Sequence, residues 1–316
     1  MGVRRLEPEG FDWASGSGGA AGVRRVLAEA TEHDHREALN EAAQLTLRNH
    51  GLDTAIMLLD EAADGGDDGD DGAGGADGAG GFAYVHGLSG LGRPELDLVV
   101  HPDARGQGVG TRLAQAALDA LGGIPVTAWS HGDHPAAARL AATLGFAAVR
   151  SLWLMRRDVA VPLPEGPLPD GMTMRLYREA DATEFLAINA EAFASHPEQG
   201  ALDARGLAER MAEDWFDPTG LFVAENADGR LAGFHWTKRH PDGVGEVYVI
   251  GVAPAAQGSG LGRALLVAGL EYLAELGVPE VVLYVESDNA AAVRLYEKFG
   301  FTHRAEDTDV MYAPED

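Results

Sequence analysis

Short apolar runs alternate with helical patterns along the chain, and they occur in the same order in its two halves. In the first half, "TAIMLL" (54–59) and "FAYVHGL" (82–88) are typical of neighbouring strands, and a later apolar run leads into a glycine-rich turn. In the second half, a strand expected over 246–252 leads into a similar turn, and leucines then recur on one side of a helix that stops at Gly277. Each half closes with a further strand and a final helix. The pattern therefore predicts two domains that mix helices and strands.

The two halves also carry matching sequence segments. Residues 101–110 and 253–262 agree at five of ten positions, and both contain Gly-x-Gly-x-Gly. Further along, "HPAAARLAATLGF" (134–146) runs parallel to "NAAAVRLYEKFGF" (289–301). A repeat of this length is too long for a solenoid unit, so it indicates a duplicated domain.

Two composition breaks suggest the boundaries. The segment 158–171, "DVAVPLPEGPLPDG", holds four prolines, which favour an extended linker between domains at 1–157 and 172–316. The segment 60–81 holds eight acidic residues, no basic ones and otherwise only small residues, so we expect a disordered loop between two strands. The spacing of a calcium-binding loop is missing there, which disfavours a metal site.

Composition narrows the class of protein. A length of 316 residues suits two domains, since domains commonly have roughly 100–200 residues. We find no apolar run long enough to span a bilayer and no secretory signal, so we expect a soluble, cytoplasmic protein. The net charge of −26 disfavours nucleic acid and anionic membranes as partners. The absence of cysteine excludes disulfides, thiolate zinc sites and a cysteine nucleophile.

The second glycine turn lies where a phosphate could bind. A strand and Pro254 precede Gln257-x-x-Gly260-x-Gly262, and a helix follows. Backbone amides at the start of a helix are unpaired and attract phosphate groups, and glycines let the backbone approach closely. No Gly-Lys-Ser/Thr follows, so the turn is not a P-loop, and it also fails the dinucleotide fingerprint.

These motifs resemble the two core motifs of the GCN5-related N-acetyltransferases. The resemblance rests on Gln/Arg-x-x-Gly-x-Gly/Ala in the turn and on Asn289-x-x-Ala292-x-x-x-Tyr296-x-x-x-Gly300-Phe301 downstream, and it is stronger in the second half. The tandem arrangement, with "ASHPEQG", "WFDPTGLF", "GFHWTKRHPDG" and "GEVYVIGVAP", is similar to members that acetylate the cysteinyl amine of a glucosaminyl-inositol precursor. The resemblance implies α/β (α+β) domains, each with a twisted, mainly antiparallel sheet that opens between its fourth and fifth strands to admit acetyl-CoA.

The resemblance implies an acetyl-CoA site at each glycine turn and no metal. In the second half, the strand would hold the pantetheine arm, the turn the pyrophosphate, and the start of the last helix the other side of the cofactor. These residues are Ile250, Gly251, Val252, Gln257, Gly258, Ser259, Gly260, Leu261, Gly262, Arg263, Asn289, Ala290, Ala291, Ala292, Val293 and Arg294. The first-half site would comprise Leu98, Val99, Val100, Arg105, Gly106, Gln107, Gly108, Val109 and Gly110.

Acetyl transfer from a thioester to an amine needs one group that takes the amine proton and another that protonates the leaving thiolate. Glu246 begins the strand that leads into the turn, near the expected thioester, and the resemblance implies that it is the general base, acting through water. Tyr296 lies two helical turns after Asn289, on the same face, and the resemblance implies that its phenol is the acid. Without cysteine, direct attack in a ternary complex is expected.

The resemblance also implies contacts to the acceptor from Glu41, Glu198, Lys238, Glu246 and Tyr284. Charged and hydroxyl groups suit a polyol that bears an amine. We expect a monomer that acts on this small molecule. Two alternatives stay open, namely an acetyltransferase of the same fold that acts on an aminoglycoside or a protein N-terminus, and a non-catalytic acyl-CoA sensor or scaffold.

The first half lacks the two catalytic residues when the motifs are superposed. Pro94 aligns with Glu246, and Ala141 aligns with Tyr296. Glu95 is one residue out of phase, so it should point to the opposite face of a regular strand unless a bulge intervenes. We therefore expect the first half to bind acetyl-CoA without catalysing transfer.

Overall fold

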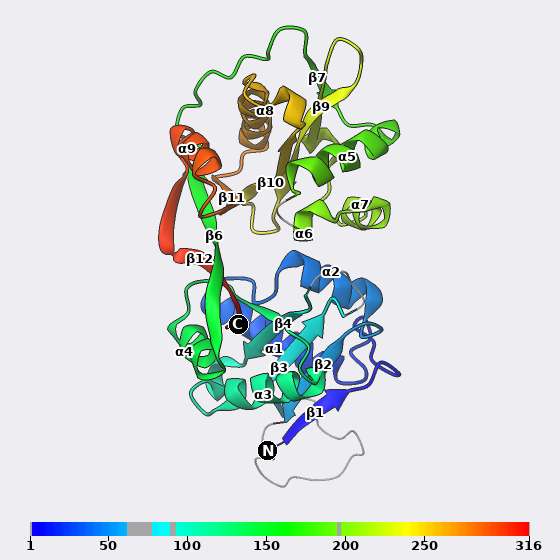
Figure 1. Ribbon diagram of the computed structural model, residues 1–316, viewed down its shortest axis with the longest axis vertical. Helices are drawn as coiled ribbons and strands as arrows, with labels where there is room; N and C mark the ends of the chain where they lie inside the picture. Colours follow the sequence, from blue (N-terminus) through cyan, green and yellow to red (C-terminus); the bar gives the residue numbers. More distant parts are fainter. Residues whose placement is uncertain (1, 62–77, 89–92, 195–196, 316) are drawn as a thin grey trace. The chain divides into compact units, whose positions relative to one another are not determined.

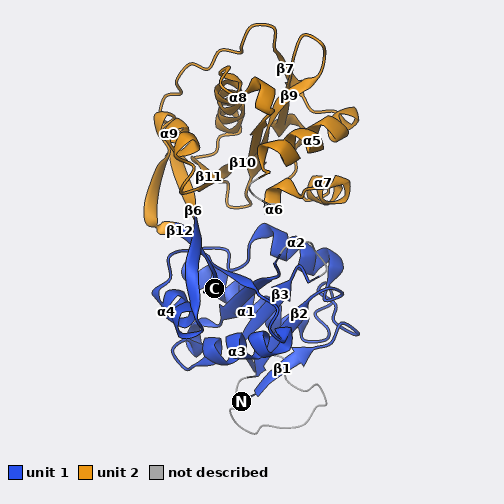
Figure 2. Ribbon diagram, in the orientation of Figure 1, with its two compact units in different colours: residues 1–151, 308–316 blue, residues 152–307 orange. Residues whose placement is uncertain are grey.

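The computed structural model describes residues 2–61, 78–88, 93–194 and 197–315, and the chain forms two compact units (Figures 1 and 2). Unit 1 comprises Met1–Ser151 and Thr308–Asp316, and unit 2 comprises Leu152–Asp307. These bounds differ from the domains expected at 1–157 and 172–316. The chain divides earlier than the proline-rich segment, and its last residues return to unit 1.

Unit 1 holds the elements of the first half of the chain. They are β1 (Gly2–Leu6), α1 (Ala20–Asp34), α2 (Glu41–His50), β2 (Ile56–Glu61), β3 (Ala79–His86), β4 (Glu95–Val100), η2 (Pro102–Ala104), α3 (Val109–Leu121), β5 (Thr127–Ser130), α4 (Pro135–Thr143) and the start of β6 (Phe146–Asp158). Its sheet pairs β1, β2, β3 and β4 antiparallel in that order, and β4 pairs with β5 in parallel.

Unit 2 repeats this order. Its elements are β7 (Thr173–Leu176), η3 (Glu179–Asp181), α5 (Ala182–Ala192), α6 (Pro197–Gly200), α7 (Ala204–Met211), η4 (Pro218–Gly220), β8 (Leu221–Glu225), β9 (Leu231–Arg239), β10 (Gly245–Val252), η5 (Pro254–Ala256), α8 (Leu261–Glu275), β11 (Glu280–Glu286), α9 (Ala290–Lys298) and most of β12 (Thr302–Pro314). The strands β7 to β10 are antiparallel neighbours, and β10 pairs with β11 in parallel. The predicted mixed, mainly antiparallel sheets are thus confirmed.

The strands β5 and β11 each pair with a strand from the other half of the sequence, and these two strands, β12 and β6, are neighbours in the strand order. Residues Val310–Tyr312 of β12 pair with Ser130–Ala128 of β5 in unit 1, whereas Leu152–Asp158 of β6 pair with Glu286–Glu280 of β11 in unit 2. This exchange explains why the units do not follow the expected boundaries. Spacing along the sequence carries no signal for it, because each strand could equally have paired within its own half.

Helices cover both faces of each sheet. In unit 1, α1 and α2 pack on the face that carries Phe82 and Tyr84, and α3 packs on the opposite face through Leu113. In unit 2, α5 covers the face of Phe234 and Trp236, while α8 and α9 belong to a core on the other face. The two faces of each sheet are therefore distinct environments, and the candidate catalytic groups can be assigned to one or the other.

The structure describes the ends of the acidic segment 60–81 and the whole of the proline-rich segment 158–171. The ends of the acidic segment 60–81 are not a loop, because Asp60 and Glu61 close β2 and residues 79–81 open β3. Asp60 is buried and accepts hydrogen bonds from Nε and Nη2 of Arg112 at 3.0 and 3.1 Å, which compensates its charge. Residues 62–77 lie outside the described residues. Residues 159–171 contain neither helix nor strand and belong to unit 2.

Across the part of the chain that the structure describes, no helix combines the length and the apolar character that a membrane crossing demands.

Candidate active site

The glycine turn of unit 2 joins the end of β10 to the start of α8. Gly258 and Gly260 have φ values of 77° and 95°, in the left-handed region where glycine avoids the strain of a side chain. Gly260 is the N-cap of α8 and has no side chain to cap the helix, while the hydroxyl of Ser259 accepts a hydrogen bond of 3.3 Å from the amide of Leu261. The side-chain amide of Gln257 donates to the carbonyl oxygen of Val252 at 3.3 Å and holds the turn against the strand. A helix start with a glycine N-cap and close backbone access is suited to a phosphate.

The turn of unit 1 has the same backbone form but a different charge environment. Gly106 and Gly108 have φ values of 73° and 77°, and Gly108 is the N-cap of α3 without a side-chain cap. Arg105, however, donates through both Nη atoms to the carboxylate of Asp34 at 2.7 and 2.8 Å. The Arg105 guanidinium holds the pKa of Asp34 below its usual value. The positive charge at this turn is thus already paired, which the sequence pattern did not indicate.

Glu246 is the second residue of β10, and its side chain is buried, with 6% of the residue exposed. Nε2 of His240 and Oε2 of Glu246 form a hydrogen bond of 2.7 Å. On one side, Glu246 pairs with Lys238 of β9, and on the other with Val282 of β11, at the last parallel pair before β10 and β11 part. A buried carboxylate therefore lies where the sheet opens, as expected for a base near a thioester.

Aromatic rings lie beside this carboxylate, and the sequence reasoning missed them. The ammonium group of Lys238 lies 4.7 Å from the ring centre of Trp215 and 5.3 Å from that of Tyr248. Nε of Arg210 donates to the hydroxyl of Tyr248 at 3.0 Å. Such cation–π contacts hold a lysine in one place. Tyr248 was visible only as one apolar residue of a strand, and nothing in the spacing linked it to Lys238.

Tyr296 lies on α9 in the core of unit 2. Its ring packs against Phe301 with centres 5.9 Å apart, and it shares a buried cluster with Val247, the residue that follows Glu246. Burial raises the pKa of Tyr296 to about 12, so the phenol keeps its proton at neutral pH. At the start of α9, Asn289 Oδ1 accepts from the amide of Ala292 at 3.1 Å. Asn289 is thus the N-cap of this helix, which fixes where Tyr296 lies.

Each half of the chain is similar to known acetyltransferases. The model of the acetyltransferase (GNAT) family matches residues 184–301, and an acetyltransferase (GNAT) domain model matches residues 70–148. A protein of a Nocardioides species named mycothiol acetyltransferase is 48% identical over 309 residues, which cover 92% of this chain and 96% of the relative. One of Streptomyces avermitilis with the same name is 45% identical over 302 residues, covering 94% and 92%.

The chain belongs to the mycothiol acetyltransferase family.

Solved structures show the same fold. A GCN5-related N-acetyltransferase from Sphaerobacter thermophilus superposes with a TM-score of 0.66 at 23% identity over 99% of this chain and 95% of the other. A tandem GNAT protein from the clavulanic acid biosynthesis pathway gives 0.69 at 17% identity over the full length of both. The arrangement of two acetyltransferase units in one chain is therefore shared with known tandem proteins.

The acceptor contacts expected for a mycothiol acetyltransferase family member are distributed over both units. Lys238 and Glu246 are cross-strand partners in unit 2, and Tyr284 lies on β11 with 46% of its surface exposed. Glu198 belongs to α6, but its side chain lies outside the described residues. Glu41 is the first residue of α2 in unit 1, directly after the N-cap Asn40. The structure therefore brings Lys238 and Glu246 together on neighbouring strands.

One expectation about the first unit of this mycothiol acetyltransferase family member is wrong. Pro94 does not take the place of Glu246. At the end of β4, Val100 pairs with Gly81 of β3, and at the end of β10, Val252 pairs with Gly233 of β9. Gly81 and Gly233 are therefore equivalent positions, and the residues of β3 and β9 can be matched one by one from there. His86 then matches Lys238, and the residue opposite His86 is Glu95. Glu95 therefore holds the place of Glu246.

A β-bulge in β10 is the cause. The register of β10 against β9 shifts between Val247 and Val249, so Tyr248 is an additional residue in that strand. The strand β4 pairs with β3 from Glu95 to Val100 without a shift. An alignment that starts from the glycine turns does not account for this additional residue. It is therefore displaced by one position for the residues that precede the bulge. The carboxylate is therefore retained in unit 1, whereas Ala141 still stands in the last helix where unit 2 has Tyr296.

Proposed function

We propose that the protein transfers the acetyl group of acetyl-CoA to the cysteinyl amine of desacetylmycothiol, the last step of mycothiol biosynthesis, and that unit 2 catalyses this reaction. The observation that carries the proposal is the buried Glu246 carboxylate, hydrogen-bonded to His240 where β10 and β11 part, on the strand that leads to the glycine turn at the start of α8. The names of relatives that are 45–48% identical support the acceptor.

The residues of unit 2 have separate roles in this proposal. Glu246 accepts the proton of the attacking amine, through a water molecule, and the hydrogen bond from His240 fixes the direction of its carboxylate. Tyr296 donates its phenolic proton to the sulfur that leaves, which its pKa of about 12 allows at neutral pH. Because the chain has no cysteine, no cysteinyl acyl-enzyme forms, and the amine attacks the thioester directly.

Binding of the two substrates follows from the same elements. The backbone of residues 250–252 lies along the pantetheine arm, the amides of residues 257–263 hold the pyrophosphate, and the first turn of α9 (289–294) lines the other side. Glu198, Lys238 and Tyr284 of unit 2 contact the pseudodisaccharide. Residues 98–100 and 105–110 of unit 1 form a second acetyl-CoA site.

The assembly belongs to the proposal as well. Each sheet is completed by a strand of the same chain, so neither needs a partner molecule at that edge. We therefore expect a monomer, located in the cytoplasm.

The test is a comparison of acceptors. Acetylation rates are measured with desacetylmycothiol, an aminoglycoside and a peptide with a free N-terminus, at equal acetyl-CoA concentration. We expect desacetylmycothiol to give the highest kcat/KM by at least about tenfold, the factor that corresponds to roughly 1.4 kcal/mol of transition-state stabilisation. Equal or lower kcat/KM for the cysteinyl pseudodisaccharide would refute the proposal.

A further inference from the structure

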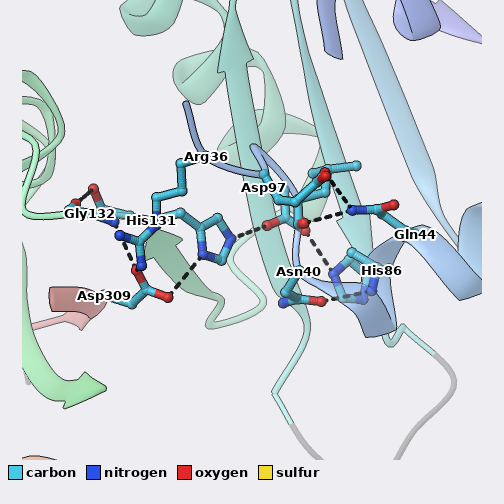
Figure 3. A network of polar contacts seen from close by, with 12 residues as sticks. Arg36, Asn40, Gln44, His86, Asp97, His131, Gly132 and Asp309 are labelled. Carbon is cyan, nitrogen blue, oxygen red and sulfur yellow. Dashed lines mark hydrogen bonds and ion pairs between the residues drawn. The ribbon is translucent and has the colours of Figure 1, made fainter. Parts of the chain in front are cut away.

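A buried polar network lies in unit 1 and contains none of the residues assigned to acetyl transfer in unit 2. Its centre is His131, which directly follows β5, and Figure 3 shows His131 between two carboxylates. Nδ1 of His131 lies 3.4 Å from Oδ2 of Asp309, and Nε2 lies 3.9 Å from Oδ1 of Asp97. The ring is thus placed by one carboxylate and faces the other.

The Asp309 carboxylate is itself held rigidly. Its Oδ1 accepts a hydrogen bond of 2.6 Å from Nη2 of Arg36 and one of 2.8 Å from the amide of Gly132. Asp309 belongs to β12, whose next residue, Val310, pairs with Ser130. A carboxylate fixed in this way orients the imidazole, and in the neutral ring that donates from Nδ1 to Asp309 the lone pair is on Nε2.

The other nitrogen of His131 is buried and has no hydrogen-bond partner in the part of the chain that the structure describes. The same holds for the hydroxyl of Tyr84, which lies opposite Asp97 across β3 and β4. Buried polar atoms without partners are uncommon in folded proteins, and each calls for an explanation. Two of them beside one buried carboxylate indicate a place for a small polar molecule.

This place lies near the position that corresponds to the centre of unit 2, because Asp97 is two residues along β4 from Glu95, the counterpart of Glu246. In unit 1, β4 and β5 last pair at Leu96 and Ala128, and Asp97 is the next residue along β4. In unit 2, the corresponding opening carries the hydrogen-bonded pair Glu246 and His240. Unit 1 likewise has a carboxylate–imidazole pair here, because Nε2 of His86 lies 2.9 Å from Oδ2 of Asp97. The strand β4 then leads from this opening to the glycine turn.

We propose that unit 1 holds a second acyl-transfer centre, in which His131 is the general base and water is the acceptor, so that this unit hydrolyses acetyl-CoA slowly. The inference rests on the proposed binding of acetyl-CoA at the glycine turn of unit 1. In this proposal His131 is the catalytic residue, because its Nε2 takes the proton of the water. Asp309 is a positioning residue that acts through the ring.

The reaction balances without another reactant. Nε2 of His131 takes a proton from water while the water oxygen bonds to the thioester carbon. The carbon–sulfur bond then breaks, and the imidazolium returns the proton to the CoA sulfur, which leaves acetate and CoA. The carboxylates of Asp97 and Asp309 stabilise the imidazolium in between, and the hydroxyl of Tyr84 is available to the acyl oxygen.

The charges around His131 affect its titration. Burial lowers the pKa of His131, but the hydrogen bond to Asp309 and the charges of Asp309 and Asp97 raise it more, and Arg36 opposes them only in part, so the pKa lies above its ordinary value of 6.5. His86 and Tyr84 are the other titratable groups beside Asp97. Hydrolysis should therefore increase as the pH rises through this raised pKa.

The experiment uses the full-length chain with E246Q and Y296F, which remove transfer by unit 2. CoA release from acetyl-CoA is followed with a thiol reagent, and because the chain has no cysteine the reagent reports CoA alone. We expect release above the buffer rate, and we expect His131→Gln to lower it by about 10²-fold, the contribution of a general base. The exposed His35→Asn of the same unit serves as the matched control and should leave it unchanged.

Asp309→Asn provides the second variant, and it also replaces His131→Gln if the latter does not fold. We expect it to lower kcat with KM for acetyl-CoA kept, and to move the acid limb of the pH profile to lower pH, which a purely structural role would not do. Calorimetric titration of the E246Q/Y296F chain with acetyl-CoA separates the possible failures. Two bound molecules without hydrolysis, or hydrolysis that His131→Gln leaves intact, overturn the second centre. A single bound molecule overturns the proposed first site, and the second centre with it.

Discussion

Nε2 of His240 and Oε2 of Glu246 lie 2.7 Å apart, so the carboxylate that we assign as the base is held by an imidazole. Since His240 acts through Glu246, His240→Phe should lower kcat by about tenfold and leave KM for acetyl-CoA within about twofold. Steady-state kinetics with desacetylmycothiol measure both. A rise in KM with kcat kept would instead show that His240 serves binding.

Removal of the base itself should have a larger effect. Glu246→Gln keeps the size and the hydrogen-bonding capacity of the side chain but cannot accept a proton, so kcat should fall by about 10²–10⁴-fold. Calorimetry should still find acetyl-CoA bound to unit 2. The exposed Glu271→Gln on α8 is the matched control and should behave as wild type. Equal losses in both variants would point to general charge effects.

Tyr296→Phe tests the acid separately from packing. The ring contact with Phe301 is retained, and only the hydroxyl is lost. We expect the midpoint of thermal unfolding to change by no more than a few degrees, while kcat falls by about 10²-fold. Because burial raises the pKa of Tyr296 to about 12, the wild-type enzyme should show no loss of kcat from phenol ionisation up to about pH 10. A variant with full activity would exclude the acid role.

The two glycine turns can be tested one at a time. Gly260 has a φ of 95° and Gly108 a φ of 77°, so a valine at either position is strained by about 1–3 kcal/mol and blocks the helix start. Gly260→Val should remove the acetyl-CoA site of unit 2 and abolish acetylation of desacetylmycothiol. Gly108→Val should lower the number of bound acetyl-CoA molecules from two to one. If Gly108→Val leaves two sites, the first turn is structural.

Stability should depend on pH through the pair of His86 and Asp97. Burial lowers the pKa of His86, but the hydrogen bond and charge of Asp97 raise it more, so the net shift is above 6.5. A raised pKa means that the pair stabilises unit 1 fully below pH 6.5 and loses this contribution as the pH rises through the raised value. Urea unfolding at several pH values measures it.

Asp97→Asn provides the counterpart to that measurement. It should cost about 1–3 kcal/mol of unfolding free energy at pH 6 and flatten the decline of stability between pH 6 and 8. Asp53→Asn, at an exposed position of the same unit, should do neither. An unchanged slope in Asp97→Asn would show that other groups set the pH dependence.

The fold could be predicted from the sequence where the same pattern of strand, glycine turn and helix occurs in both halves. The matched glycine turns and final helices predicted two related acetyltransferase units. Most leucines after Gly260 lie buried in α8 as their spacing requires, whereas Leu276, which follows the helix, is 38% exposed. Local periodicity suffices for such elements, because the chain itself sets which residues share a helix face.

Two kinds of feature could not be predicted. The additional residue at Tyr248 changes no spacing rule, yet it displaces every alignment beyond the turn and hid the match between Glu95 and Glu246. The network around His131 joins Asp97 to Asp309, which are 212 positions apart in a chain where either strand could have paired elsewhere. Such contacts depend on which strands become neighbours, and that choice is made by the whole fold.

The exchange of β6 and β12 has a consequence for how the protein is made. The ribosome synthesises the strands β1 to β5 first, but Val310–Tyr312, which pair with β5, follow only after the whole of unit 2. Until then the nascent unit 1 has an open edge at β5, and β6, which has already been synthesised, is a strand that could occupy it. Native assembly therefore requires that β6 stays unpaired with β5 until β11 has been synthesised. The order in which the strands are synthesised thus differs from the order in which they pair.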